Sequence, residues 1–270
     1  MYETDGEDRV MTFAVRRIFY AAVTLASFAA AMPVNVPAYA NDLRQEMRLV
    51  TGDAFPPFAD RAYDGGGIVT EVVRRSFDAM GYQNVSVIWR SWLKGFEMTV
   101  EGRVDGTFPY AQTPSRKKLV LFSEPITNLS AYGWFAKKHE KYDDNIDLLG
   151  KSLCLPLGHG ELGHTGKLLA SGQAKRVSPP DMKTCFKLLA AGRVDSVVSP
   201  VPEALNAMSE AGLSPDDFDH IGQSLSNMPL YFVVGVNHPS AQIIIKDFNA
   251  GLAVLRANGE LEKILSQARY

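Results

Sequence analysis

The sequence has 270 residues, of which 46% are hydrophobic and 21% are charged, and its formal net charge at pH 7 is -2. This is the composition of an ordinary globular protein, and the length suffices for one large domain or two modest ones. The near-neutral charge argues against a nucleic-acid-binding protein, which needs a basic face. We therefore expect no nucleic-acid partner.

The chain begins with the three parts of a secretory signal. Two arginines at 16 and 17 precede the apolar run IFYAAVTLASFAAAM, and an Ala-Tyr-Ala cleavage motif ends at Ala40. We predict that residues 1–40 are a signal peptide, with Met11 as an alternative start because residues 1–10 are acidic. The competing interpretation, a membrane anchor, needs about 20 apolar residues, and this run is shorter. The residue directly after the cleavage site is not a cysteine, so we expect an exported, soluble protein without a lipid anchor.

Beyond this segment, strand-like and helix-like patterns alternate. A strand is expected at 47–52 and a helix at 67–82, where apolar side chains recur at helical spacing before a glycine stop. The alternation continues to the end, with strands expected at 85–89, 151–155, 175–178 and 229–236, and helices at 92–102, 161–171 and 181–192. Two closing helices are expected within 239–268, on either side of Asn258-Gly259. Strands that alternate with helices predict a largely parallel α/β fold.

A repeated motif, the Gly-Arg-Val-Asp echo, predicts two lobes. FEMTVEGRVDGTF (96–108) and FKLLAAGRVDSVV (186–198) each read as a helix, then Gly-Arg-Val-Asp, then a strand. Chance is the alternative, but four identical residues in the same local context favour two lobes of similar topology around a ligand cleft. We read AYGWFAKK and PLYFVVGV as paired crossover strands, which puts lobe one at 43–133 plus 231–270 and lobe two at 134–230.

The Thr-Pro-Ser-Arg segment ending at Arg116 predicts an anion site. Thr113 can cap a short helix and the following proline suits its first position, which leaves free backbone N–H groups. The guanidinium of Arg116 would add a fork that matches a carboxylate. The adjacent lysines, Lys117 and Lys118, are expected to form only a solvated basic patch.

The two cysteines are read in the light of export. Cys154 lies in a strand-like run and Cys185 in an amphipathic helix. In an oxidising compartment an even pair favours a disulfide, and such a bond would stabilise the fold by about 4 kcal/mol. Two separate buried thiols are the alternative that the sequence leaves open.

The ordered set of motifs resembles the amino-acid-type periplasmic solute-binding proteins of ABC importers, extracellular family 3. The set comprises TGDAFPPF, Trp92, the T-P-S-R segment, LFSEP, GKSLCLPLGHGEL, LAAGRVDSVV and ANGELEKIL, and it covers essentially the whole chain after residue 40. The resemblance implies a two-lobe, type II periplasmic-binding-protein fold. It also implies a periplasmic, monomeric receptor that is not an enzyme and holds no cofactor or metal. Such a receptor would bind a small solute and contact an ABC permease transiently.

The resemblance also implies site residues. Arg116 would hold a ligand carboxylate, Phe55 and Trp92 would form aromatic walls, and the loop of Gly158, His159 and Gly160 would supply contacts from lobe two. We add Tyr110 and Thr113, which flank the strand end before Arg116, as candidate contacts. From the residues alone, Phe55 and Phe58 fit a core equally well, and we assign Phe58 to packing.

The pattern departs from the family at Pro200. Relatives that bind α-amino acids place an aspartate there to pair with the ammonium group, and proline cannot accept that charge. Glu203 or Glu161 could replace it, or the ligand could lack an amine; Glu203 is otherwise an ordinary carboxylate at a helix start. Two further functions stay open: a dehydratase-like lyase on the same scaffold, for which Glu161, Glu203 and His159 are candidates, and a free-standing sensor module.

Overall fold

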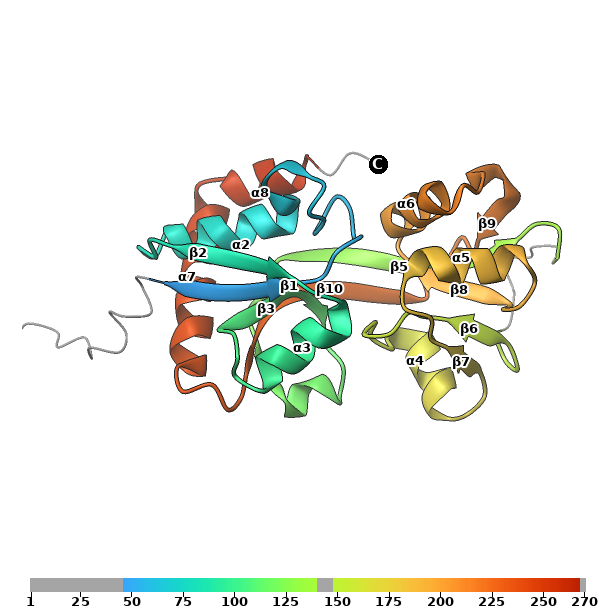
Figure 1. The fold of residues 1–270 in the computed structure, drawn as a ribbon, viewed down its shortest axis with the longest axis horizontal. Helices are drawn as coiled ribbons and strands as arrows, with labels where there is room; N and C mark the ends of the chain where they lie inside the picture. Colours follow the sequence, from blue (N-terminus) through green and yellow to red (C-terminus); the bar gives the residue numbers. More distant parts are fainter. Residues whose placement is uncertain (1–45, 140–147, 268–270) are drawn as a thin grey trace, which may run out of the picture. The chain divides into compact units, whose positions relative to one another are not determined.

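A computed structural model of the chain describes residues 46–139 and 148–267, all of which belong to one compact unit (Figure 1). The predicted signal peptide, residues 1–40, lies outside these described residues. Among them, no helix is both long and apolar enough to span a bilayer.

The first lobe is built on a parallel sheet that ends in an antiparallel strand. Strands β1 (Met47–Thr51), β2 (Val85–Trp89) and β3 (Gly106–Ala111) run parallel in the order β2-β1-β3, and β10 (Ser226–Gly235) pairs antiparallel with β3 and with β4 (Val120–Phe122). Helices α2 (Ile68–Asp78), α7 (Ala241–Ala257) and α8 (Glu260–Leu265) cover one face, and α3 (Trp92–Val100) covers the other.

The core of this lobe forms where α2 and α7 meet the sheet. The ring of Phe77 on α2 contacts those of Phe232 on β10 and Phe248 on α7, with centroids 5.4 and 5.5 Å apart. Phe77 belongs to the apolar stripe that the helical spacing of 67–82 predicts. Removing such aromatic area from water is the main driving force for folding here.

The second lobe repeats the arrangement with a smaller sheet. Strands β6 (Ser152–Cys154), β7 (Lys175–Val177) and β8 (Ser196–Ser199) run parallel in the order β8-β6-β7, and β9 (Phe218–His220) pairs with β5 (Thr127–Ala136). Helices α5 (Met182–Ala190) and α6 (Val201–Ala211) pack with Trp134 on one face, and α4 (Gly163–Ala170) packs with Phe135 on the other. Successive side chains of a strand point to opposite faces, so β5 supplies both cores.

Two long strands join the lobes, as the sequence predicts. β5 and β10 pair antiparallel from Thr127↔Leu230 to Ala131↔Ser226. Beyond this segment β5 continues into the second sheet, pairing with β8, and β10 continues into the first. The two-lobe α/β fold is therefore confirmed, whereas the residue bounds assigned to each lobe stay a prediction.

The Gly-Arg-Val-Asp echo has the same structural role in both lobes. The N–H of Asp105 donates to the carbonyl of Arg48, and the N–H of Arg48 donates back to the Asp105 carboxylate. Asp195 exchanges the same two bonds with Ser152. In each case the aspartate joins the start of the strand after the helix to the start of the neighbouring parallel strand.

One disulfide joins Cys154 on β6 to Cys185 on α5 inside the second lobe, with the two Cα atoms 5.6 Å apart. The predicted pairing is confirmed. The short helix expected after Thr113 is a single 3₁₀ turn at Arg116–Lys118, and Thr113 Oγ1 accepts from the Arg116 N–H as expected for a cap. The chain leaves this turn at once because the next residues, β4, pair with β10.

Candidate ligand-binding site between the lobes

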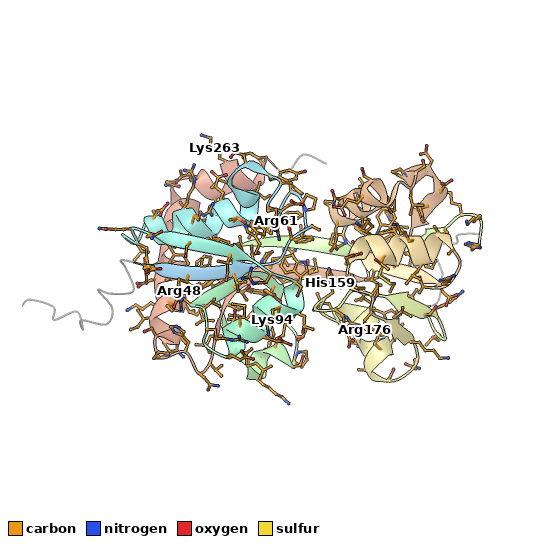
Figure 2. The ribbon with its side chains drawn as sticks, in the orientation of Figure 1. Arg48, Arg61, Lys94, His159, Arg176 and Lys263 are labelled. Atoms are coloured by element: carbon orange, nitrogen blue, oxygen red, sulfur yellow. A yellow bond between two sulfur atoms is a disulfide. The ribbon has the colours of Figure 1, made fainter. Side chains whose placement is uncertain are left out.

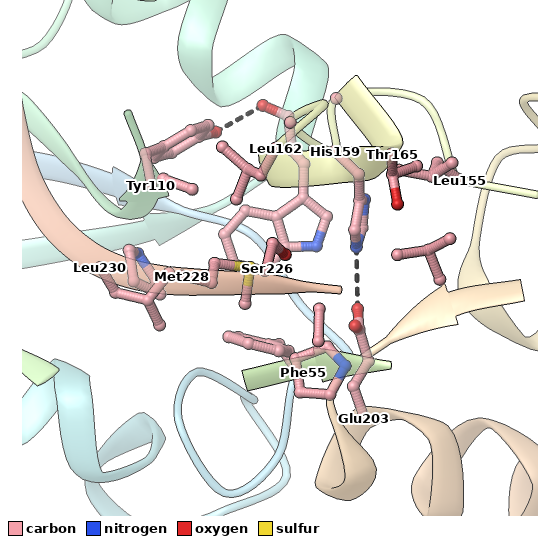
Figure 3. Close-up of a pocket in the computed structure, with 18 of the residues that line it drawn as sticks. Phe55, Tyr110, Leu155, His159, Leu162, Thr165, Glu203, Ser226, Met228 and Leu230 are labelled. Atoms are coloured by element: carbon pink, nitrogen blue, oxygen red, sulfur yellow. Dashed lines mark hydrogen bonds and ion pairs between the residues drawn. The ribbon is translucent and has the colours of Figure 1, made fainter. Parts of the chain in front are cut away.

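A cavity lies where the crossover strands meet both lobes, with a volume of about 690 Å³ including its open mouth (Figure 3). Most of its wall is apolar. The wall residues, counted among those described, are Phe55, Trp92, Pro109, Tyr110, Ala111, Arg116, Ala131, Leu155, Gly158, His159, Gly160, Leu162, Thr165, Val198, Pro200, Glu203, Ser226, Met228 and Leu230. An apolar cavity with a few converging polar groups is typical of a small-molecule site.

Arg116 is the cation of this wall, and it bridges the two lobes. Its Nη1 donates to the carbonyl of Ala111 at 2.7 Å, and its Nη2 donates to the carbonyl of Gly158 in the second lobe at 2.6 Å. The guanidinium lies 5.0 Å from the Tyr110 ring centroid and 5.5 Å from that of Phe96. These contacts orient the fork and leave further N–H groups for a ligand.

Partial burial favours binding of an anion to the Arg116 guanidinium. Desolvation lowers its pKa below the ordinary arginine value, and the nearby Arg176 lowers the pKa further. No described acidic side chain lies within ion-pair distance of Arg116. A partly desolvated cation whose contacts are neutral carbonyls and aromatic rings is stabilised when an anion binds.

Three aromatic side chains line the lobe-one wall. The Trp92 ring meets Phe55 and Tyr110 edge to face, with centroids 6.0 and 5.8 Å apart. Trp92 lies flat against the end of β1, so close that a Cβ on Gly52 would fall 2.1 Å from its ring. Only glycine therefore allows the ring to occupy this place.

Tyr110 fixes the start of α3 relative to β3. Its hydroxyl donates to the carbonyl of Trp92 at 2.5 Å, and burial raises the pKa of the phenol, so it stays a donor. Phe55 lines the cavity and also contacts Phe58, which is buried in the core as assigned from the sequence. Phe55 thus combines the wall and packing roles that the sequence left open.

The lobe-two loop that includes Gly158, His159 and Gly160 packs directly on lobe one. Gly158 has a φ of 84°, and a Cβ there would fall 2.8 Å from the backbone nitrogen of Leu93 on α3. Arg176 holds the loop from behind, because its Nη2 donates to the carbonyls of Pro156 and His159. Figure 2 places His159 between the two lobes and Arg176 within the second.

The second charged group of the wall is Glu203, in the first turn of α6. Its side chain turns into the cavity, where Oε1 lies 2.8 Å from His159 Nε2 and Oε2 accepts a 2.8 Å hydrogen bond from the Ser199 hydroxyl. Only 3% of Glu203 is exposed. The expectation of an ordinary carboxylate at a helix start is therefore incomplete, since this residue is part of the cavity.

Most of the predicted site residues come together here, and two do not. Thr113 is absent from this wall: its Oγ1 accepts from the Arg116 N–H at 3.2 Å and so supports Arg116 from behind. Glu161 is also absent from the wall, and its carboxylate pairs with Arg176. Pro200 does line the cavity, three residues before Glu203 in the chain. Among the described residues no cluster of metal-ligating side chains occurs.

The family model of the bacterial extracellular solute-binding proteins, family 3, matches residues 47–268. The chain belongs to this family. The resemblance drawn from the ordered motifs is confirmed. Because the described part of the chain lies almost wholly within the match, the two-lobe fold and the cavity between the lobes belong to the family region.

Relatives of this family-3 protein are mainly binding proteins. The arginine-binding periplasmic protein of Mannheimia haemolytica is 29% identical over 155 residues, which are 56% of this chain and 60% of that protein. The match thus spans less than two thirds of that relative. An ancestral arginine-binding protein bound to arginine gives a TM-score of 0.69 at 22% identity, covering 83% of this chain and 98% of the other.

A sensor module has the same fold. A histidine kinase sensor domain with similarity to periplasmic binding proteins gives a TM-score of 0.70 at 22% identity, covering 83% of this chain and 96% of the other. At these identities the structural matches show the fold alone.

Sequence reasoning left Thr165 out of this family-3 cavity and gave Glu203 a different main role. Thr165 sits in α4, and nothing in its local pattern marks it as a cavity residue. For Glu203 the signal was the missing carboxylate at Pro200, three positions earlier, since a cleft that lacks one acidic group can take another from the adjacent helical turn.

Proposed function

We propose that this protein is a periplasmic receptor that captures a small, carboxylate-bearing, amino-acid-like solute between its lobes and delivers it to an ABC transporter permease. The carboxylate would bind the Arg116 guanidinium, with Phe55 and Trp92 as the walls on the lobe-one side. The loop of Gly158, His159 and Gly160 would close the site from lobe two.

One observation carries this proposal: the half-buried guanidinium of Arg116 lines the interlobe cavity and contacts neutral carbonyls and aromatic rings, with no described carboxylate at ion-pair distance. The family membership and the arginine-binding relatives support the same reading. Contacts from both lobes to one arginine also suit hinge closure, since a ligand held by both lobes shifts the population toward the closed state.

The test is ligand binding by the chain from residue 41 onward, measured by thermal shift and then by calorimetry against amino acids, hydroxy acids and dicarboxylates. A ligand at 100 times its Kd should add about 2.7 kcal/mol of stability. Arg116→Ala should weaken binding roughly 30-fold or more, because truncating one member of a buried charge pair costs at least about 2 kcal/mol.

Lys117→Ala is the matched control, because Lys117 lies in the same turn, is exposed and does not line the cavity. If both variants bind a carboxylate equally well, Arg116 is not the anchor. If no carboxylate stabilises the protein at all, the proposed function is wrong.

A lyase on the same scaffold is the second candidate, because His159 and Glu203 place a hydrogen-bonded acid–base pair in the cavity wall. General acid–base chemistry uses such pairs. Incubating each ligand that binds with the protein and analysing it by mass spectrometry separates the two functions, since a receptor returns its ligand unchanged. A free-standing sensor would bind in the same way and deliver its signal to a partner protein instead of a permease.

A further inference from the structure

The two charged groups of the cavity wall differ in how far their charges are already compensated. Arg116 donates to two neutral carbonyls, and no described carboxylate is close enough to pair with it. A partly desolvated cation in this position favours an anionic partner. The Arg116 side of the cavity therefore calls for a negative charge from the ligand.

The Glu203 side calls for no charge from the ligand. Each carboxylate oxygen already accepts a hydrogen bond, one from His159 Nε2 and one from the Ser199 hydroxyl, both at 2.8 Å. Glu203 also lies in the first turn of α6, where the helix N-terminus stabilises negative charge. A ligand ammonium group would have to compete with partners that are in place.

On the Glu203 side of the cavity, two polar atoms have no hydrogen-bond partner among the described residues. Nδ1 of His159 and Oγ1 of Thr165 are buried, both residues line the cavity, and neither atom has a hydrogen-bond partner among the described residues. Thr165 is only 1% exposed. Nδ1 of His159 accepts a hydrogen bond when the ring is neutral and donates one when it is protonated, and the threonine hydroxyl can also donate or accept. A hydroxyl group can serve both atoms.

The other residues of the cavity wall indicate that the rest of the ligand is apolar. The remaining side chains are mostly apolar, among them Leu155, Leu162, Val198, Met228 and Leu230. No described carboxylate besides Glu203 lines the cavity, so a second cation on the ligand, such as a guanidinium, would lack a partner there. An unpaired buried charge costs several kcal/mol.

We propose that the ligand is a monocarboxylate with an apolar body and a neutral hydroxyl where an amino acid has its ammonium group. This inference rests on the proposed function, because it needs Arg116 as the carboxylate anchor. In it, His159 Nδ1 and Thr165 Oγ1 bind the hydroxyl, while Ser199 and Glu203 hold the His159 ring in place.

The experiment uses probes that differ only at the carbon beside the carboxylate: phenyllactate, phenylalanine and phenylpropionate, with 2-hydroxyisocaproate and leucine as an aliphatic pair. Arginine and glutamate serve as charged comparisons. Calorimetry measures the Kd of each probe. Whichever of phenyllactate and 2-hydroxyisocaproate binds more tightly should have a Kd at least about tenfold lower than that of its amino acid counterpart, phenylalanine or leucine. Thr165→Val should weaken binding of phenyllactate about 3- to 10-fold, the range of one buried hydrogen bond, and leave phenylpropionate unchanged.

Comparing the two probes shows whether Thr165 contacts the ligand hydroxyl. If Thr165 had only a structural role, Thr165→Val would weaken the binding of phenyllactate and phenylpropionate equally. The inference is overturned if phenylalanine or leucine binds as tightly as its hydroxy acid or more tightly, above all if Glu203→Gln then removes that binding. It is also overturned if arginine or glutamate is preferred. In each of these cases the proposed function stands, whereas both proposals fail if no carboxylate binds.

Discussion

Arg116 and Gly158 join the two lobes through one hydrogen bond, from the guanidinium Nη2 to the backbone carbonyl, over 2.6 Å. The donor is in the 3₁₀ turn of lobe one and the acceptor is in the loop before α4. The residue proposed to hold the ligand carboxylate therefore also holds the lobes together in the unliganded molecule. Under the proposed function, ligand binding and lobe closure would use the same side chain.

The first prediction concerns closure without ligand. Arg116→Met keeps the length of the side chain but removes its donors, and a hydrogen bond from a charged donor contributes about 1.5–3 kcal/mol. The equilibrium between closed and open lobes should shift toward the open state by roughly 10- to 100-fold. Small-angle X-ray scattering should report a larger radius of gyration for the variant than for Lys117→Met. Equal radii would show that this bond does not hold the lobes closed.

The second prediction compares two glycines that share a left-handed backbone. Gly158 and Gly172 have φ values of 84° and 71°, so alanine costs each of them about 1–2 kcal/mol. A Cβ at 158 would in addition meet Leu93 and Trp92 across the lobe boundary, at 2.8 and 2.9 Å, whereas nothing lies within 4 Å at 172. Gly158→Ala should therefore lower ligand affinity more than tenfold, and Gly172→Ala should lower only the free energy of unfolding.

Calorimetry and urea unfolding of both variants check this second prediction together. Equal ligand affinities for the two variants would mean that the loop around Gly158 does not close on lobe one when ligand is bound.

The third prediction concerns the disulfide. Cys154 and Cys185 are 31 residues apart in sequence, and closing a loop of that length stabilises the folded state by about 4 kcal/mol in the chain-entropy model. Replacing both cysteines with alanine should lower the free energy of unfolding by about 2–4 kcal/mol, measured by urea denaturation. Adding a reductant should destabilise the natural protein and leave the variant unchanged. Coincident unfolding curves for the two proteins would contradict this.

The fourth prediction concerns pH and Asp195. Burial alone would raise the pKa of this carboxyl, but hydrogen bonds from the Ser152 hydroxyl and N–H, together with nearby Lys151, hold it below its ordinary value. Its stabilising contribution is thus complete above the unfolded-state pKa of about 4 and is lost as pH falls through the lower folded-state pKa.

Asp195→Ala should accordingly lower the free energy of unfolding by about 0.5–1 kcal/mol at pH 6–7, because water screens the charge of this exposed residue, with a smaller difference from the natural protein below about pH 4. Asp195→Asn, which keeps one acceptor oxygen without a titrating charge, should lie between the two at neutral pH. Urea unfolding across this pH range measures the effect. A difference that stays constant down to pH 2 would rule out a charged Asp195 as its source.

The local elements of the fold were predictable because each is marked by nearby residues. Apolar spacing marks α2, and the two Gly-Arg-Val-Asp segments mark the same helix-to-strand junction in each lobe. The helix expected after Thr113 is limited to one 3₁₀ turn because the following residues pair with β10, more than 100 positions away. A capping signal carries no information about a distant strand.

The residues of the candidate site also fall into those that the sequence predicts and those that only the tertiary structure reveals. The sequence alone pointed to Arg116, the aromatic pair Phe55 and Trp92, and the glycine loop, since each belongs to a short ordered motif. The tertiary structure alone decided that Glu203 turns into the cavity, because its direction depends on His159, which is 44 positions away in the chain. It likewise brought Thr165 to the same wall through the packing of α4. Local spacing determines which face a side chain shares with its neighbours, but the packing of distant elements determines what that face meets.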